Sequence, residues 1–186
     1  MTTFRRVVTG VGADGKAHFV SDGPAPIRSG SAETGVTFMW ATDGLPVVPT
    51  DGADQATSDR SFHAKAGGSR CIMGVFQPGF GVVNPDAGLA SMERPDQTTG
   101  SFSGRGGSAQ SVPLEQLSMH ATPTVDYATV ISGEVELVLD SGEAVMLRAS
   151  DTVIQNGTVH GWRNSSDKPV LIAFTMLGAT MTPSVS

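Results

Sequence analysis

The chain has 186 residues, a mass of 19.2 kDa, a formal net charge of −6 at pH 7 and a pI near 5.0. This acidic balance argues against a nucleic-acid partner, because phosphate binding needs a face of clustered positive charge. Only 16% of the residues are charged, while 23 are glycine and 11 are proline, which fits one turn-rich all-β domain better than a helical one.

Targeting and redox features indicate a cytoplasmic protein. Residues 1–6 lack the apolar core of a signal peptide. No segment approaches the run of about eighteen apolar residues that would predict a membrane-spanning helix, so we expect no membrane partner. The single cysteine, Cys71, cannot form an intramolecular disulfide, so nothing implies an oxidising compartment. Because Cys71 lies in an apolar run, we expect a buried and unreactive thiol.

Alternating segments near the start predict a hairpin and a third strand. Residues 5–9 form the first strand, residues 17–21 pair with it across a turn at 12–15, and residues 36–42 form the third strand. The sequence Asp-Gly-Pro-Ala-Pro at 22–26 predicts a firm break after the hairpin. These strands either complete one barrel or cross to a neighbouring subunit, where pairing would cover their exposed edges.

The middle of the chain has few strand signals. Residues 43–70 are rich in Gly, Pro, Asp and Ser and predict loops, whereas residues 71–77 predict a core strand that Pro-Gly-Phe-Gly at 78–81 closes. Residues 84–112 predict a long flexible loop, within which residues 87–94 can form one or two helical turns. A loop of this kind is either disordered or a lid over a site.

Short alternating strands separated by glycine turns follow. Asp126, Ala128 and Val130 lie on one face of a strand because side chains alternate with a period of two. Turns at Gly133 and Gly142 lead into the next two strands. A succession of strands of similar length with no helical period favours a closed or sandwiched antiparallel barrel, which has room for one small ligand.

This region carries a histidine, a carboxylate and a second histidine whose spacing suits one inward-facing site: His120, Asp126 and His160. Two imidazoles and one carboxylate leave open positions on a metal ion, and this set suits Fe(II), while Zn, Mn or Ni fit with water completing the shell. Without a metal, the same residues form an acid–base group, because a histidine can move a proton and a nearby aspartate can fix its tautomer.

Several residues here resemble the two sequence motifs of the cupin superfamily, over roughly residues 118–178: His120, Asp126, Gly133-Glu134, Gly142-Glu143, Asp151, Gly157, His160 and Asn164. In that family the first motif supplies His, His and Glu, and the second supplies one more His. The resemblance places the first His at His120, the Glu position at Asp126 and the last His at His160. The second His position falls on Thr122, which is a poor metal ligand.

The resemblance implies a cupin-type antiparallel β-barrel, jelly-roll-like, with an N-terminal strand extension and long loops. It also implies that one divalent metal ion (Fe, Zn, Mn or Ni) can be held by His120, Asp126 and His160, and that the protein forms a homodimer. Within one domain, residues 1–83 complete or extend the barrel, residues 84–112 form the flexible loop, and residues 113–180 carry the cupin motifs.

We expect Thr122, Gln155 and Trp162 to line the pocket. If His160 points inward, Trp162 and Asn164 share its face by alternation, although Trp162 can equally belong to the core. Ala128, Val130 and the residues from Ile131 to Leu139 supply small and branched apolar walls, and Tyr127 faces the other way. Nothing in the sequence pairs His18 or His63 with the site.

Two classes of function fit these residues. The first is an enzyme acting on a small organic molecule, either by a lyase, dehydratase or isomerase reaction or as an Fe(II)-dependent dioxygenase. We favour the non-oxidative reaction, because Thr122 weakens the ligand set. The second class is a non-catalytic cupin that binds a small ligand. A regulator would normally also carry a DNA-reading helix pair, which this chain lacks.

Overall fold

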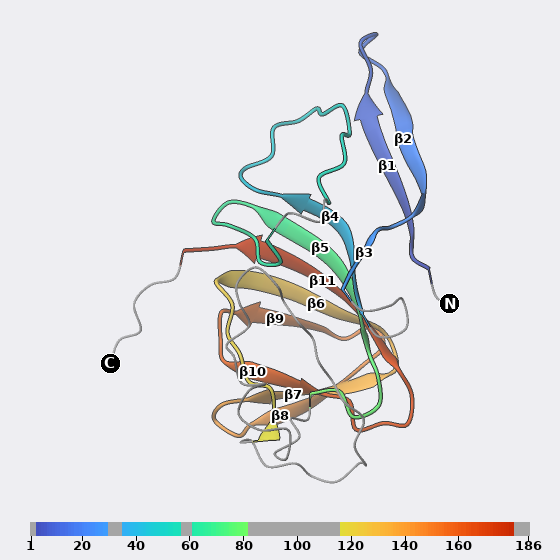
Figure 1. The fold of residues 1–186 in the computed structure, drawn as a ribbon. Coiled ribbons are helices and arrows are strands. Elements are labelled where there is room, and N and C mark those ends of the chain that lie inside the picture. Colours follow the sequence, from blue (N-terminus) through green and yellow to red (C-terminus); the bar gives the residue numbers. More distant parts are fainter. Residues whose placement is uncertain (1–2, 30–34, 57–60, 82–115, 181–186) are drawn as a thin grey trace.

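The structure is a computed structural model that describes residues 3–29, 35–56, 61–81 and 116–180, and it is built from β-strands (Figure 1). The strands of this part of the chain are β1 Arg5–Val11, β2 Ala17–Pro24, β3 Ile27–Ser29, β4 Val36–Thr42, β5 Ser69–Phe76, β6 Thr124–Ser132, β7 Glu134–Leu139, β8 Ala144–Arg148, β9 Thr152–Asn156, β10 His160–Arg163 and β11 Val170–Gly178. No helix within these ranges is long and apolar enough to cross a membrane.

The described strands form three antiparallel sheets. The largest has the order β3-β4-β5-β11-β6-β9, a second has the order β10-β7-β8, and β1 and β2 make a separate hairpin. The buried apolar cluster draws side chains from both larger sheets, so it fills the space between them. This arrangement confirms the expected all-β antiparallel barrel. Because β3, β4 and β5 pair within the six-stranded sheet, they complete the same barrel.

Strand β6 shows how side-chain alternation builds this barrel. Thr124, Asp126, Ala128 and Val130 are buried, whereas Tyr127 between them is 44% exposed, as the period of two predicted. On one side β6 pairs with β9, and on the other it pairs with β11, which in turn pairs with β5. Strand β11 is therefore a central strand of the largest sheet, as Figure 1 shows.

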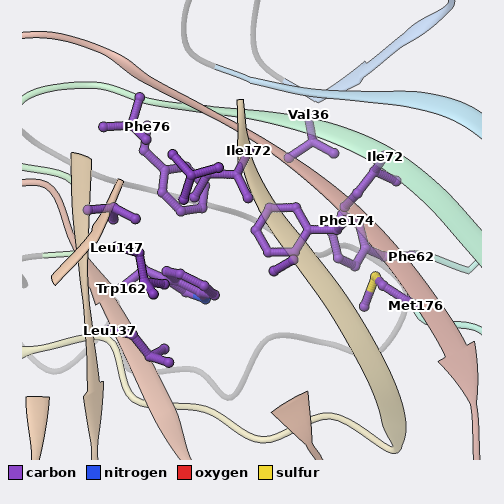
Figure 2. Packing of buried hydrophobic residues seen from close by; sticks show 14 of the residues in the cluster. Val36, Phe62, Ile72, Phe76, Leu137, Leu147, Trp162, Ile172, Phe174 and Met176 are labelled. Carbon is purple, nitrogen blue, oxygen red and sulfur yellow. The ribbon is translucent and has the colours of Figure 1, made fainter. Parts of the chain in front are cut away.

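Aromatic side chains from both sheets meet in the core (Figure 2). The rings of Phe76 and Phe80 are stacked with centroids 3.9 Å apart, and Phe76 also meets Trp162 at 6.2 Å. Trp162 and Phe174 pack edge to face at 5.8 Å. Offset and edge-to-face pairs of this kind stabilise a core by about 0.5–1.5 kcal/mol beyond the burial of their area. Trp162 thus joins the two sheets and belongs to the core.

The β1–β2 hairpin stands apart from the two larger sheets (Figure 1). Arg6 ties it to the barrel, since its guanidinium pairs with Asp54 and lies 5.9 Å from the centre of the Trp40 ring on β4. A cavity of about 440 Å³ lies between β1 and β4, lined by residues of β1 together with Met39, Trp40 and Thr50.

The prediction of a break at 22–26 is wrong for its first half. Residues 22–24 belong to β2 and pair with the start of β1, where Arg5 donates two hydrogen bonds of 2.7 Å to the carboxylate of Asp22. A proline is tolerated at Pro24 because it ends an edge strand, where a missing N–H costs little. The hairpin prediction itself is confirmed.

Strand β5 begins at Ser69, two residues before the predicted start, because Ser69 pairs with Thr42 on β4 and their hydroxyls lie 2.9 Å apart. Between β4 and β5 the described residues form no strand, as predicted. Cys71 is half-buried, so the expectation of a buried thiol is met only in part, while burial raises the pKa of the thiol, which fits an unreactive cysteine.

The predicted flexible loop at 84–112, with its helical turns at 87–94, lies outside the described residues. The division into residues 1–83, 84–112 and 113–180 stays a prediction.

Candidate functional site

Two histidines lie side by side at the start of β10. The backbone N–H of His120 donates to the carbonyl of His160 and the reverse bond also forms, both at 2.9 Å. This bridge places the two imidazole rings with centroids 4.5 Å apart and an interplanar angle of 49°. The structure therefore brings together two of the three predicted site residues. His160 is 4% exposed, and His120 is partly buried.

A backbone bond sets the orientation of His160. Its Nδ1 lies 2.8 Å from the carbonyl oxygen of Thr158. A carbonyl only accepts hydrogen bonds, so Nδ1 carries the proton, and in the neutral ring Nε2 is left as a bare nitrogen. The ring also lies perpendicular to that of Trp162, with centroids 6.0 Å apart at 89°.

Burial keeps both imidazoles neutral. It is the main cause that lowers the pKa of His160 to about 4, and the charge of His120 lowers it further, while the bond to Thr158 opposes the change. Burial also lowers the pKa of His120, opposed by its contact with the carbonyl of Ser118. At neutral pH the pair therefore consists of two bases without charge.

Asp126 lies on β6 among hydroxyl groups. It is 6% exposed, and burial raises the pKa of its carboxyl, while hydrogen bonds from Thr124 and Thr122 act in the opposite direction. The hydroxyls of Thr122 and Thr124 also lie 2.6 Å from each other. Among the described residues, Oδ1 of Asp126 is buried and has no hydrogen-bond partner.

Gln155 faces Asp126 from the neighbouring strand. The two residues are register partners on β6 and β9, so their side chains lie on one face of the sheet. The Oε1 atom of Gln155 accepts a bond from the hydroxyl of Thr158, whose carbonyl accepts the bond from His160. Its Nε2, like Oδ1 of Asp126, is buried without a partner in the described structure. An unmet acceptor and an unmet donor thus occupy facing positions, as expected where a ligand supplies the missing partners.

The donor set does not fit a metal ion held by three protein ligands. Within residues 3–29, 35–56, 61–81 and 116–180, no three His, Cys, Asp or Glu side chains are grouped so that they could hold a metal. His120 and His160 would serve as a ligand pair, but Asp126 does not join them, and Thr122 bonds to Thr124. The metal set of His120, Asp126 and His160 stays a prediction that a metal measurement would test.

Other predicted pocket residues have structural roles. Trp162 packs in the core, with one edge against His160. Asn164 is fully buried and donates to the carbonyls of Phe76 and Lys168 at 2.9 and 2.8 Å, so it fixes a turn and does not line a pocket.

Ile131 is 49% exposed, so the prediction that it forms part of the apolar wall is wrong, because alternation turns it outward after Val130.

His63, which the sequence did not pair with the site, lies within electrostatic range of it. Its pKa is lowered first by burial and then by the charges of His120 and Arg70. Its sequence signal is a neighbouring aromatic residue, Phe62, which is the one Phe, Tyr or Trp among residues 43–68. His18 is exposed on β2, consistent with the expectation that it plays no part.

Comparison with known proteins finds partial relatives. No family model matches the chain. Phomopsin biosynthesis cluster protein C' of Diaporthe leptostromiformis is 52% identical over 48 residues, 26% of this chain and 25% of that protein. The cupin-domain-containing oxidoreductase srdB of Neurospora crassa is 46% identical over 61 residues, 32% of this chain and 31% of that protein. Several of these partial relatives are named cupin-domain-containing oxidoreductases, which agrees with the resemblance noted in the sequence.

The matches to these relatives are partial, since the chain spans about a quarter to a third of the length of the curated relatives it matches. Among solved structures, it is similar to a protein with a double-stranded β-helix domain from Klebsiella pneumoniae, with 18% identity, coverage of 84% of this chain and 86% of that one, and a TM-score of 0.44. A Cupin 2 conserved barrel domain protein from Salinispora arenicola has 17% identity, coverage of 76% of each chain and a TM-score of 0.36.

Proposed function

We propose that this chain is a cupin enzyme of the lyase, dehydratase or isomerase type that moves a proton on a small organic molecule. The observation that carries the proposal is the bare Nε2 of a buried His160, whose other nitrogen is held by the carbonyl of Thr158. A nitrogen fixed in this tautomer can act only as an acceptor, which is what a general base requires. The unmet atoms of Asp126 and Gln155 supply the remaining groups.

The chemistry that these groups support best is the loss of water from a β-hydroxy carbonyl compound. Nε2 of His160 takes a proton from the carbon beside the carbonyl, and the amide of Gln155 donates to the carbonyl oxygen as negative charge develops there. The C–O bond on the next carbon breaks, and the hydroxyl leaves as water with a proton from Asp126. The proton on His160 then returns through solvent to Asp126, so that the enzyme is regenerated.

The surroundings of Asp126 favour its role as the general acid. Burial raises the pKa of its carboxyl, which favours the protonated form that can donate. Thr122 and Thr124 hold the carboxyl through hydrogen bonds and leave Oδ1 free for the substrate. Because the two histidines are neutral, the site as a whole favours a substrate without net charge.

A direct test uses 4-hydroxy-2-butanone as substrate and follows butenone formation by ¹H NMR. The wild-type protein is expected to form butenone faster than buffer, and His160→Asn is expected to lower the rate by about 10²-fold or more. Asparagine places an N–H where Nδ1 lies, so it keeps the bond to Thr158 and removes only the base. His18→Asn, at an exposed histidine, is the control and should match wild type. A wild-type rate equal to that of buffer, or an active His160→Asn, would refute the proposal.

The second candidate is an oxidoreductase, including an Fe(II)-dependent dioxygenase, which the names of srdB and other partial relatives favour. Elemental mass spectrometry on protein purified without added metal separates the two. About one equivalent of metal in wild type, lost in both His120→Ala and His160→Ala and accompanied by O₂ uptake, would favour the oxidoreductase. Absence of metal even after titration with iron, zinc, manganese or nickel would favour proton transfer. Ligand binding without turnover would indicate a binding cupin.

A further inference from the structure

His63 lies in the loop between β4 and β5, and aromatic contacts fix its ring. The ring of Phe62 packs edge to face against Phe38 of β4 at 5.7 Å. The imidazole of His63 packs edge to face against Phe62 at 5.0 Å and 82°. Because Phe62 and Phe38 are both members of the buried cluster, this stack holds His63 against the barrel interior. Figure 2 labels Phe62 among the members of that cluster.

A buried arginine anchors the backbone of this loop. Arg70 has no exposed surface, and its Nε donates to the carbonyl of Ser61 at 2.9 Å. Its other nitrogens donate to the carbonyl of Thr42 at 2.6 Å and to the carboxylate of Asp43 at 2.7 Å. Burying a guanidinium costs several kcal/mol unless such partners are present, so the Ser61 carbonyl is held firmly beside His63.

The other end of the loop is fixed by β11. Gly67 donates to the carbonyl of Gly178, and Gly178 donates to the carbonyl of Gly68, at 3.0 and 2.9 Å. A Cβ atom on Gly178 would lie 1.8 Å from the carbonyl oxygen of Lys65, so the loop backbone lies directly on the strand. The position of His63 is therefore set by the barrel and is not that of a free surface loop.

One atom of this fixed side chain lacks a partner. Nδ1 of His63 is buried and makes no hydrogen bond among the described residues. Asp126 and Gln155 carry the other buried side-chain atoms there that lack partners, and both belong to the proposed site. His63 also lies close enough to His120 for the charge of one to affect the other. An unmet buried nitrogen is costly, which favours a ligand group or an ordered water beside it.

We propose that His63 is a third histidine of this site and that its Nδ1 binds a hydroxyl or carbonyl oxygen of an uncharged hydroxy-carbonyl substrate. The inference rests on the proposed function for the class of substrate. His63 is a binding residue in this account, while His160 remains the base. If His63 had only a structural role, an ordered water molecule would bind Nδ1 in place of the substrate. The variants described next distinguish substrate binding from this structural role.

The test compares three variants at the same position by the binding of 4-hydroxy-2-butanone, measured from ligand-induced shifts in ¹H–¹⁵N spectra of the full chain. His63→Phe keeps the aromatic packing and removes both nitrogens. His63→Asn places an amide near the position of Nδ1, and His63→Gln places one near Nε2. Because the unmet atom is Nδ1, we expect His63→Phe and His63→Gln to raise the Kd about tenfold, and His63→Asn to stay within about threefold of wild type.

Each outcome decides between the alternatives. Equal affinity of His63→Phe and wild type, with both folded as judged by their spectra, would overturn the role of His63. Rescue by His63→Gln rather than His63→Asn would also overturn it, because the wrong nitrogen would then be responsible. Absence of binding to wild type would overturn the assigned class of ligand. Binding that depends on His63 without formation of butenone would support His63 and refute the proposed reaction instead.

Discussion

The lowered pKa of His160 links the stability of the fold to pH. A histidine with a pKa near 6.5 in the unfolded chain and about 4 in the folded chain binds more protons when unfolded at any pH between these values. Its contribution to stability is therefore complete above pH 6.5 and is lost as the pH falls towards 4. Asp126 acts in the opposite direction, because a raised carboxyl pKa makes the folded state bind more protons as the pH falls.

The size of the effect follows from the two pKa values. At about 1.4 kcal/mol per pH unit, lowering the pKa from 6.5 to about 4 corresponds to about 3 kcal/mol in full. Of this, about 2.5 kcal/mol is lost between pH 7 and pH 4.5, where the folded form has just begun to bind the proton. This is a large share of the stability of a typical domain, which is about 5–15 kcal/mol.

The assay is urea unfolding at pH 7, 6, 5 and 4.5, for wild type and for His160→Asn. Asparagine cannot titrate, while an amide near Nδ1 keeps a donor for the carbonyl of Thr158. The contribution of Asp126 is present in both proteins and cancels in the comparison, whereas that of His120 cancels apart from its coupling to His160. We expect the free energy of unfolding of wild type to fall by about 2.5 kcal/mol more than that of the variant over this range. Parallel pH dependences of the two proteins would refute the reasoning.

Two further perturbations test the packing. Gly81→Ala is expected to lower the free energy of unfolding by about 3 kcal/mol or more, because Gly81 has a φ of +91° and an added Cβ would lie 1.7 Å from the carbonyl oxygen of Trp162. Gly23→Ala, with nothing within 4 Å of the added atom, should change it by less than about 0.5 kcal/mol in the same urea titration. Phe174→Ala is expected to lower the free energy of unfolding by about 3–5 kcal/mol, measured by thermal unfolding. Phe19→Ala, at a side chain that is 75% exposed, should leave the unfolding midpoint nearly unchanged. Equal effects of the two substitutions would contradict the assigned core.

The strands of the barrel were predictable from sequence because the pattern that marks each strand lies within a few consecutive residues. A period of two and glycine turns mark β6, β7 and β8, and the buried faces of Asp126, Ala128 and Val130 follow directly from that pattern. The position of Asp126 on the inner face was therefore predicted correctly. The combination of Asp126 with the histidine pair in one site stays a prediction, because the distance between β6 and β10 depends on how two sheets pack.

His63 was missed for a related physical reason. A loop residue carries no periodic signal, and its place in the molecule is set by groups remote in sequence, here the side chain of Arg70 and the backbone of Gly178. The bond between Nδ1 of His160 and the carbonyl of Thr158 is equally invisible in the sequence, since any residue at position 158 supplies a carbonyl. The pattern can predict which residues face inward, but not which of their atoms lack a partner.

The central place of β11 has a consequence for the order of assembly during synthesis. The ladders of β5 and of β6 are joined only through this strand, which is the last of the described strands to be translated. Until Val170 to Gly178 have left the ribosome, the earlier strands of the large sheet form two separate groups whose inner edges are exposed. Premature pairing of these edges between nascent chains would compete with folding, so chaperone protection at this stage would matter more for this barrel than for one closed by an early strand.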